Sequence, residues 1–370
     1  MLIAIDTKNL ALYSGGIAAL LKSLLIPWIR AKPNFKFILV GPSFAMDDLV
    51  IYPNVEFQNV SWPTWIPRPL RHVVYDNALF PNAIKKLKPE LLYTPYHDVR
   101  LPKDILTVMS IHDTCIGDLP GIYPAKIRFY YEFMLKLNMR AADLILTGTN
   151  ASKSDVVRRY GCSDSVVKVI PNTLDFGLVS ETPSHAMVNL KVTSASESLA
   201  LMYSGGSEYR KNIDRLMEAF QIVIQNGLKP TLKITGNYDA GWKTCLNKFP
   251  ASVTERVNFT GFLSLAELRN AYLESDVIVY PSLCEGFGRV ILEAMMLGRP
   301  VACSNIAVLR EVGGDYPEYF DPTDVHDIVR GIQNASKTIS KTPVMDTRFS
   351  NKSVADLFID SMDSLIKEMV

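Results

Sequence analysis

The sequence predicts an α/β protein of two Rossmann-like domains, each built around a doubly wound parallel sheet. Three observations support this fold class. The chain has 370 residues, which is too many for one ordinary core and suits two domains. Short apolar runs alternate with amphipathic stretches, a pattern typical of βαβ units. These runs form two sets, separated by a segment rich in Ser, Thr and Pro.

The expected strands are the short apolar runs. The first set is Leu2–Ile5, Phe37–Val40, Leu91–Tyr93, Thr107–Ile111, Leu144–Thr147 and Val167–Ile170. The second set is Leu199–Ser204, Thr231–Thr235, Val257–Thr260, Val277–Tyr280 and Pro300–Cys303. Helices are expected between them, for example over Ile17–Arg30, Lys126–Arg140 and Ile213–Asn226, where apolar residues recur at helical spacing.

The domain boundary is expected where this periodicity stops. The stretch from Thr173 to Glu197 shows no clear periodicity of apolar residues, as expected of a linker. Residues 1–172 are therefore predicted to form the N-terminal domain. Residues 173–350 would form the linker and the C-terminal domain. Residues 351–370 carry apolar side chains at helical spacing, and this helix is expected to return toward the N-terminal domain.

Composition and charge limit the class of protein. A net charge of +1 argues against a protein that coats nucleic acid. Five cysteines at irregular spacing, without a C-x-x-C pair, favour a reducing cytosol over a disulfide framework or zinc site. Asp6 comes too early for a signal peptide, and the early apolar stretch is broken by Lys22 and Pro27. The expected location is the cytoplasm, either in solution or peripherally on the inner face of the plasma membrane.

The segment from Pro281 to Met295 carries the most specific chemistry. Glu285 and Glu293 flank seven residues after a predicted buried strand, and Gly286 and Gly288 let the backbone approach a ligand closely. A helix starting near Gly288 offers free N–H groups to an anion. A carboxylate accepts two hydroxyl hydrogen bonds, so one glutamate suits a sugar and the other a ribose. The alternative is a solvated loop glutamate and a surface helix glutamate.

A second segment supplies positive charge. A predicted strand ends in Gly205-Gly206, and Arg210 and Lys211 precede a helix for which Asn212 is a suitable N-cap. Two cations at a helix N-terminus can neutralise a leaving diphosphate. The alternative is a pair of exposed cations beside a turn.

The first domain contains weaker candidates. Gly15-Gly16 links the first strand region to the first helix and allows a pyrophosphate or an acceptor to approach, but a G-x-G-x-x-G motif is absent. His112 follows the predicted strand Thr107–Ile111, at the usual ligand edge of a doubly wound sheet. A flexible turn and a structural histidine are the respective alternatives.

The segment Pro281 to Met295 resembles the donor-site signature of the retaining glycosyltransferase family 4, which has the GT-B fold. Arg210-Lys211 is similar to the phosphate clamp of that family, and further matches extend from Gly15 to Asp321-Pro322. Two departures stand out: Met296 replaces the usual Ala, and Arg289-Val290 replaces the usual Leu-Pro. The Arg289 departure puts an extra cation near the site.

The resemblance implies two domains that face each other across a cleft, with residues 1–172 on the acceptor side and the C-terminal domain within 173–350 binding the nucleotide sugar. It also implies a role for each site residue. Arg210 and Lys211 would hold the diphosphate, and Glu293 the ribose. Glu285 and the backbone near Phe287 and Gly288 would hold the sugar. The Gly15-Gly16 loop would close over the donor phosphates, and His112 would contact the donor sugar.

The resemblance also implies an activity similar to that of bacterial mannosyltransferases and rhamnosyltransferases. Such an enzyme moves a hexose, with retention, from a GDP- or UDP-linked donor to a glycan or lipid-linked acceptor in lipopolysaccharide, O-antigen or polysaccharide biosynthesis. No cofactor is expected. No Asp-x-Asp motif occurs, so metal-independent transfer is expected. A nucleotide-sugar epimerase and a non-catalytic sugar-nucleotide-binding protein are the alternatives, and the complete set of cations and glutamates argues against the second.

One surface is open to two interpretations. A Pro-broken loop and a nearby helix carry aromatic and basic residues: Trp62, Trp65, Arg68, Arg71, His72, Lys85, Lys86 and Lys88. Aromatic residues with cations can bind anionic lipid or a lipid-linked diphosphate. Ordinary loop packing beside a solvated helix face explains the same residues.

Overall fold

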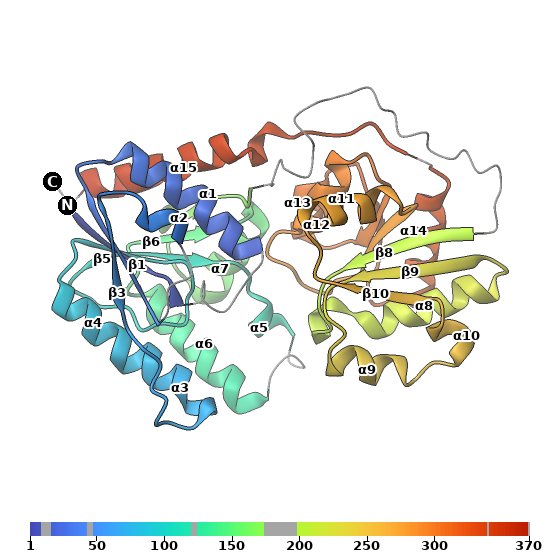
Figure 1. Ribbon diagram of the computed structural model, residues 1–370, viewed down its shortest axis with the longest axis horizontal. Coiled ribbons are helices and arrows are strands. Elements are labelled where there is room, and N and C mark those ends of the chain that lie inside the picture. Colours follow the sequence, from blue (N-terminus) through green and yellow to red (C-terminus); the bar gives the residue numbers. More distant parts are fainter. Residues whose placement is uncertain (9–15, 43–46, 120–123, 174–197, 339, 369–370) are drawn as a thin grey trace. The chain divides into compact units, whose positions relative to one another are not determined.

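A computed structural model describes the chain from residue 1 to 368, apart from residues 9–15, 43–46, 120–123, 174–197 and 339. The chain divides into two compact units. The first unit comprises Met1–Thr173 together with Thr347–Val370, and the second comprises Leu174–Asp346. Each unit contains one parallel β-sheet with helices packed on it (Figure 1). The predicted linker, Thr173–Glu197, lies outside the described residues except for Thr173.

The sheet of the first unit has the strand order β3-β2-β1-β4-β5-β6-β7, and every pairing is parallel. Its strands are β1 (Leu2–Asp6), β2 (Lys36–Gly41), β3 (Val55–Asn59), β4 (Leu91–Thr94), β5 (Leu106–Ile111), β6 (Leu144–Thr147) and β7 (Val167–Val169). The central strands are buried along their whole length, as expected for a parallel sheet covered on both faces.

The helices of the first unit are named in chain order. They are α1 (Gly16–Ala31), α2 (Asp47–Val50), α3 (Arg68–Val74), a π-helical turn η2 (Tyr75–Leu79) and α4 (Phe80–Leu87). Next come α5 (Cys115–Asp118), α6 (Ala125–Met139), α7 (Asn150–Tyr160) and the final helix α15 (Asn351–Lys367). Ser350 caps α15 by accepting a hydrogen bond from the backbone N–H of Ser353.

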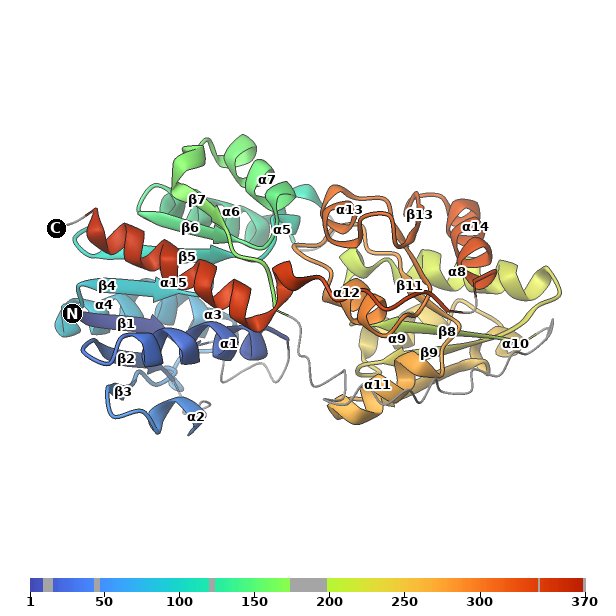
Figure 2. The same ribbon diagram turned by 90° about the horizontal axis from the view of Figure 1, so that it is seen from above.

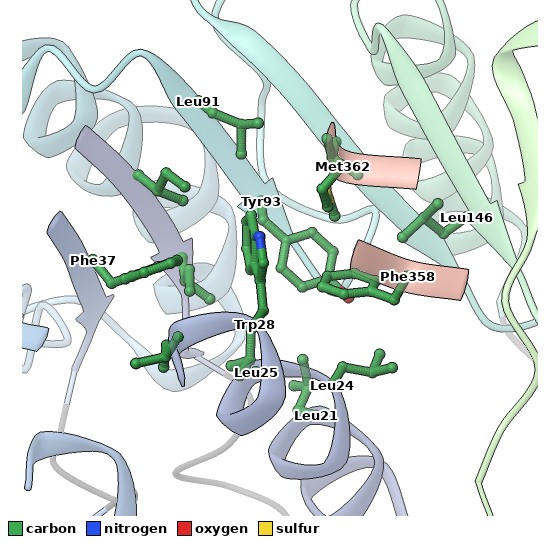
Figure 3. Close-up of a cluster of buried hydrophobic side chains, with 14 of the residues drawn as sticks. Leu21, Leu24, Leu25, Trp28, Phe37, Leu91, Tyr93, Leu146, Phe358 and Met362 are labelled. Atoms are coloured by element: carbon green, nitrogen blue, oxygen red, sulfur yellow. The ribbon is translucent and has the colours of Figure 1, made fainter. Parts of the chain in front are cut away.

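The core of the first unit explains why the chain returns to it. α15 lies beside α1 over one face of the sheet (Figure 2). Trp28 of α1 is fully buried, with its ring 5.2 Å from that of Phe37 and 5.4 Å from that of Phe358 on α15 (Figure 3). Phe358 also contacts Tyr93 of β4. Burial of such aromatic side chains stabilises a core by roughly 1.5–3 kcal/mol each, which ties residues 351–367 to the first unit.

The second unit has the strand order β10-β9-β8-β11-β12-β13, which matches that of the first unit without a counterpart of β7. Its strands are β8 (Ser198–Ser204), β9 (Lys229–Thr235), β10 (Val257–Gly261), β11 (Val277–Tyr280), β12 (Val301–Ser304) and β13 (Glu318–Phe320). Its main helices are α8 (Ile213–Gln225), α9 (Ala240–Leu246), α10 (Ala251–Thr254), α11 (Leu265–Leu273), α12 (Arg289–Met296), α13 (Ala307–Gly313) and α14 (Val325–Ser336). The predicted fold class, two parallel-sheet α/β domains, is confirmed.

Two strands were not predicted, and both are edge strands. β3 has the sequence Val-Glu-Phe-Gln-Asn and is buried only at Val55, and β13 has three residues. An edge strand contacts the sheet on one side only, so it needs neither a long nor a continuous apolar run. The apolar signal on which the strand predictions depended is therefore weak at these positions.

The strand order decides where ligands can bind. In each sheet the order reverses between two adjacent strands, β1 and β4 in the first unit and β8 and β11 in the second. In open α/β sheets, ligands bind outside the carboxyl ends of the strands at such a point. The segments 205–212 and 281–288 follow β8 and β11, so the two predicted donor-site segments meet at the reversal point of the second unit.

Candidate active site

Two glycines shape the loop that follows β8. The hydroxyl of Tyr203 lies 2.9 Å from where a Cβ of Gly205 would be, and it donates a hydrogen bond to the carbonyl oxygen of Gly206. A side chain at Gly205 would displace that hydroxyl. The chain then forms a single 3-10 turn over Tyr209–Lys211, which presents Arg210 and Lys211 just before α8.

Asn212 occupies the N-cap position of α8, but its side chain makes no capping bond. Its backbone has a φ of 57°, and its Nδ2 donates to the carbonyl oxygens of Pro281 (3.0 Å) and Pro322 (2.7 Å). The prediction that Asn212 is the N-cap residue is therefore confirmed, although its side chain does not supply a capping bond. The buried amide is used instead to join three loops, and the backbone N–H of Leu283 adds a bond to the carbonyl oxygen of Arg210 (2.7 Å).

The side chains of Arg210 and Lys211 converge on one carboxylate oxygen of Glu285. Lys211 Nζ lies 2.7 Å and Arg210 Nη1 3.0 Å from Glu285 Oε1. Lys211 Nζ also donates to the hydroxyl of Tyr280, at 2.9 Å, and lies 4.9 Å from the centre of its ring. Only 10% of the Lys211 side chain and 9% of the Glu285 side chain is exposed, against 25% for Arg210. The group carries one net positive charge in a largely dry environment, where that charge acts strongly on an anion.

The ionisation of Glu285 follows from these neighbours. Burial by itself would raise the pKa of the carboxyl group, but the charges of Lys211 and Arg210 outweigh that effect and lower the pKa to about 2. Glu285 is therefore ionised throughout the physiological range. A permanently ionised carboxylate can accept hydrogen bonds but cannot donate a proton.

The glycine loop positions the start of α12. Gly288 has a φ of 100°, and a Cβ there would come 2.6 Å from Leu309 Cδ2, so both conformation and space require glycine. Gly286 and Phe287 are buried beside it. The eight-residue helix α12 begins directly after this loop. The backbone N–H groups of its first turn have no acceptor within the helix, which favours the binding of an anion there.

Glu293 lies inside α12, and its two oxygens have different partners. The hydroxyl of Tyr272 on α11 donates to Glu293 Oε2 at 2.7 Å. Arg289, one turn earlier on α12, places its Nη2 3.4 Å from Glu293 Oε1. The cation that departs from the family signature therefore lies against the carboxylate that the resemblance assigns to the ribose.

The candidate residues of the first unit are less completely described. Gly16 is the first residue of α1, and Gly15 lies outside the described residues. His112 follows β5, and its Nε2 lies 2.8 Å from the carbonyl oxygen of Pro95. A carbonyl oxygen only accepts, so Nε2 carries the hydrogen and Nδ1 is left as an acceptor. Burial lowers the pKa of His112, which keeps the ring neutral.

Sequence reasoning missed two tyrosines that hold the site residues. Tyr272 is fully buried on α11 and Tyr280 is the last residue of β11. Each lies beside a charged site residue, Tyr272 beside Glu293 and Tyr280 beside Lys211. The position of Tyr280 at the end of a predicted buried strand was a usable signal. Tyr272 lies within helix α11, where nothing in the local sequence marks it as a partner of Glu293.

A buried charged cluster in the first unit was missed as well. Lys8, which follows β1, is fully buried and pairs with Asp76 (2.6 Å) and Asp98 (2.7 Å). Its backbone N–H donates to Asp6 at the end of β1. Burial raises the pKa of Asp6 to about 7 and that of Asp76 to about 8, whereas the charge of Lys8 outweighs burial at Asp98 and lowers its pKa.

This cluster predicts how stability depends on pH. The folded chain keeps the protons of Asp6 and Asp76 up to about pH 7 and 8, whereas the unfolded chain releases them near the ordinary value of 3.8. Their contribution is therefore full below pH 3.8 and is lost as the pH rises toward 8. Asp6→Asn is expected to flatten the decline in melting temperature between about pH 4 and 7, the interval over which the unfolded chain releases this proton and the folded chain keeps it. The exposed Asp104→Asn is the matched control, and an equally steep decline in all three proteins would contradict the expectation.

The aromatic and basic residues considered as a membrane surface have different surroundings. Trp62 packs its ring against His72 and Tyr75, and Arg71 donates to the carbonyl oxygens of Thr64 and Ile66. Trp65 is 81% exposed, and the side chain of Arg68 lies outside the described residues. Lys85 and Lys88 instead line a cavity with Met1 and Leu106, at the amino-terminal edge of the sheet. Packing accounts for Trp62, Arg71 and His72.

Two features are absent from the described residues, one concerning metals and one concerning membranes. No group of three or more His, Cys, Asp or Glu side chains gathers there in a way that could hold a metal ion. Among the helices of the described part of the chain, none is both long and apolar enough to cross a membrane.

With the geometry established, comparison with known proteins identifies the class. Residues 37–177 match the model of Glycosyltransferase Family 4, and residues 191–344 match that of Glycosyl transferases group 1. The protein is a glycosyltransferase of the GT-B type. It belongs with the family 4-like glycosyltransferases, as the signature around Glu285 indicated.

Its relatives include sugar transferases of surface polysaccharides. It is 29% identical over 255 residues to O-antigen chain mannosyltransferase B of Escherichia coli, a match covering 66% of this chain and 65% of that protein. The chain thus spans just under two thirds of that relative's length. It is 25% identical to the O-antigen chain mannosyltransferase RfbU of Salmonella typhimurium, over 81% of this chain and 78% of that one.

Solved structures support the fold. Anabaena Alr3699/HepE in complex with UDP-glucose aligns with a TM-score of 0.72 and 17% identity, over 98% of this chain and 100% of that one. WaaG, a glycosyltransferase involved in lipopolysaccharide biosynthesis, aligns with a TM-score of 0.67 and 13% identity, over 98% and 95%. At these identities the likeness concerns the fold.

Proposed function

We propose that the protein is a retaining hexosyltransferase that moves mannose or a similar hexose from a nucleotide-diphosphate sugar to a glycan or lipid-linked acceptor. The observation that carries the proposal is the group of Arg210, Lys211 and Glu285 at the carboxyl ends of β8 and β11. It combines a surplus positive charge for a diphosphate with a carboxylate for sugar hydroxyls. The named O-antigen mannosyltransferases support both mannose and a role in lipopolysaccharide biosynthesis.

The chemistry that this group can perform is leaving-group stabilisation. As the bond between the sugar and the diphosphate breaks, negative charge grows on the β-phosphate. Lys211 and Arg210 are held by Glu285 before the reaction, so they need little reorganisation to meet that charge. The first turn of α12 adds N–H groups and a positive dipole end.

The route to retention that fits these residues is same-face attack within an ion pair. Glu285 is shared between two cations, which withdraw charge from its oxygen and make it a poor nucleophile. Glu293 is held by Tyr272 and Arg289 on the helix. Attack by the acceptor on the face that the diphosphate leaves requires no carboxylate nucleophile, and the departing diphosphate can take the acceptor proton.

Two measurements test the proposal in sequence. Thermal-shift screening against GDP-mannose and other GDP-, UDP- and dTDP-sugars should raise the melting temperature for the true donor, because a ligand that binds only the folded state stabilises it. Incubation with that donor should then release nucleoside diphosphate slowly without acceptor. An isomerised sugar nucleotide would indicate an epimerase, and binding without release would indicate a non-catalytic protein. The anomeric configuration of a transfer product, determined by NMR, decides retention.

Transfer is expected to be independent of a divalent metal. The reason is the cationic pair Arg210 and Lys211, which occupies the role that a metal has in other transferases, together with the absence of an Asp-x-Asp motif from the sequence. Donor hydrolysis measured in excess EDTA should equal that in buffer with magnesium. Complete loss in EDTA, restored by magnesium or manganese, would overturn the expectation.

A further inference from the structure

The carboxylate of Glu293 is oriented by a residue on another helix. Tyr272 is fully buried on α11, and its hydroxyl donates to Glu293 Oε2 at 2.7 Å across the gap between α11 and α12. The Glu293 side chain is itself only 9% exposed. A buried carboxylate that accepts a short bond from a buried hydroxyl has its rotamer restricted, because turning it away would cost the buried hydroxyl its acceptor.

The proton of this bond belongs to the tyrosine. Burial raises the pKa of Tyr272 well above its usual value, and the charge of Glu293 raises it further. The phenol therefore remains protonated, and a donor, throughout the physiological pH range. A donated bond to a carboxylate is of the strong, charge-assisted kind.

The second oxygen of Glu293 has a looser neighbour. Arg289 Nη2 lies 3.4 Å from Oε1, which is longer than a typical N–H···O bond. A ligand hydroxyl can therefore add to Oε1 or replace the guanidinium there, whereas Oε2 already accepts the bond from Tyr272. The two oxygens of Glu293 are thus differentiated before any ligand arrives.

We propose that Tyr272 is a positioning residue for the donor site, which aims Glu293 so that Oε1 binds a ribose hydroxyl of the nucleotide. This inference rests on the proposed function, in which Glu293 holds the ribose. Tyr272 contacts no substrate itself, so its whole effect on binding must pass through Glu293. This dependence on Glu293 distinguishes a positioning role of Tyr272 from a purely structural role in the core.

The test uses ligands with and without the ribose hydroxyls. Calorimetric titration is performed with GDP, UDP and dTDP, and then with the 2′,3′-dideoxy form of whichever binds the wild-type protein most tightly. Tyr272→Phe should weaken binding of the ordinary nucleotide by about tenfold, as loss of a charge-assisted bond does. Binding of the dideoxy nucleotide should not change, because it has no hydroxyl for Glu293 to hold.

A double variant tests whether the effect passes through Glu293. Tyr272→Phe combined with Glu293→Gln should bind the ordinary nucleotide no more weakly than Glu293→Gln alone, since residues that act as one unit are not additive. Additive losses would overturn the proposal. So would an equal loss for both nucleotides in Tyr272→Phe, or no loss for either.

Tyr316→Phe is the matched control. Tyr316 is also in the second unit, and its hydroxyl donates to the backbone carbonyl oxygen of Arg299 at 3.1 Å. Each Phe variant loses one hydroxyl bond and so some stability, but only Tyr272→Phe should discriminate between the two nucleotides. If the wild-type protein binds none of GDP, UDP and dTDP, the proposed function fails. If it binds one and Tyr272→Phe behaves as Tyr316→Phe does, only the positioning role fails.

Discussion

Lys211→Ala is expected to lower the turnover number by about two orders of magnitude or more, the usual effect of removing one group that stabilises transition-state charge. The donor Michaelis constant should change much less. Charge on the diphosphate grows as the sugar departs, so the contact with Lys211 is stronger in the transition state than in the bound donor. The ammonium group is 10% exposed, which keeps that contact largely free of water.

The matched control for this variant is Lys233→Ala. Lys233 is in the same unit and also forms an ion pair, at 2.7 Å with Glu274, but it lies away from the loops that follow β8 and β11. Its loss should leave turnover unchanged. Steady-state kinetics with the identified donor and acceptor, together with melting temperatures, separate lost catalysis from lost folding. A change confined to the donor Michaelis constant would mean that Lys211 binds the ground and transition states equally.

Glu293→Gln is expected to lose nucleotide affinity, whereas Glu285→Gln is expected to lose turnover. Glu293 should hold the ribose equally in the ground and transition states, so its substitution should weaken nucleoside-diphosphate binding by roughly 1.5–3 kcal/mol. Turnover at saturating donor should fall little. A nucleoside diphosphate without sugar should suffer the same loss, since it carries the same ribose.

Glu285→Gln should leave that affinity intact while turnover falls. Glu285 shares its Oε1 between Lys211 and Arg210, so removing its charge frees both cations for the phosphates. Affinity for the diphosphate should consequently be retained, whereas the sugar loses its carboxylate and the cations lose their fixed position. Calorimetry with the diphosphate and turnover with the full donor are measured on both variants. Equal losses of diphosphate affinity would mean that the two carboxylates have been assigned to the wrong ends of the donor.

The prediction from sequence was strongest where the signal is local. Strands such as β5 and β11 are continuous apolar runs because both faces of a parallel sheet are covered, and they were found within a residue or two. Gly288 was identified from its place before a helix, and its φ of 100° gives the reason. The edge strands β3 and β13 lack that apolar signal, since one side of each meets no neighbour in the sheet.

The sequence by itself determined the class of protein and the segments that carry charge, because turn glycines, cations and carboxylates act through their immediate neighbours. Only the tertiary structure decided which of them meet. Lys211 and Glu285 are 74 residues apart, and they touch because a crossover places β11 beside β8. Tyr272 and Glu293 are 21 residues apart on two helices, and no periodicity relates them. Asn212 was read as a helix cap from its position, yet its amide reaches two distant carbonyls. Such pairings depend on strand order and helix packing, which arise from the whole core rather than from any local pattern.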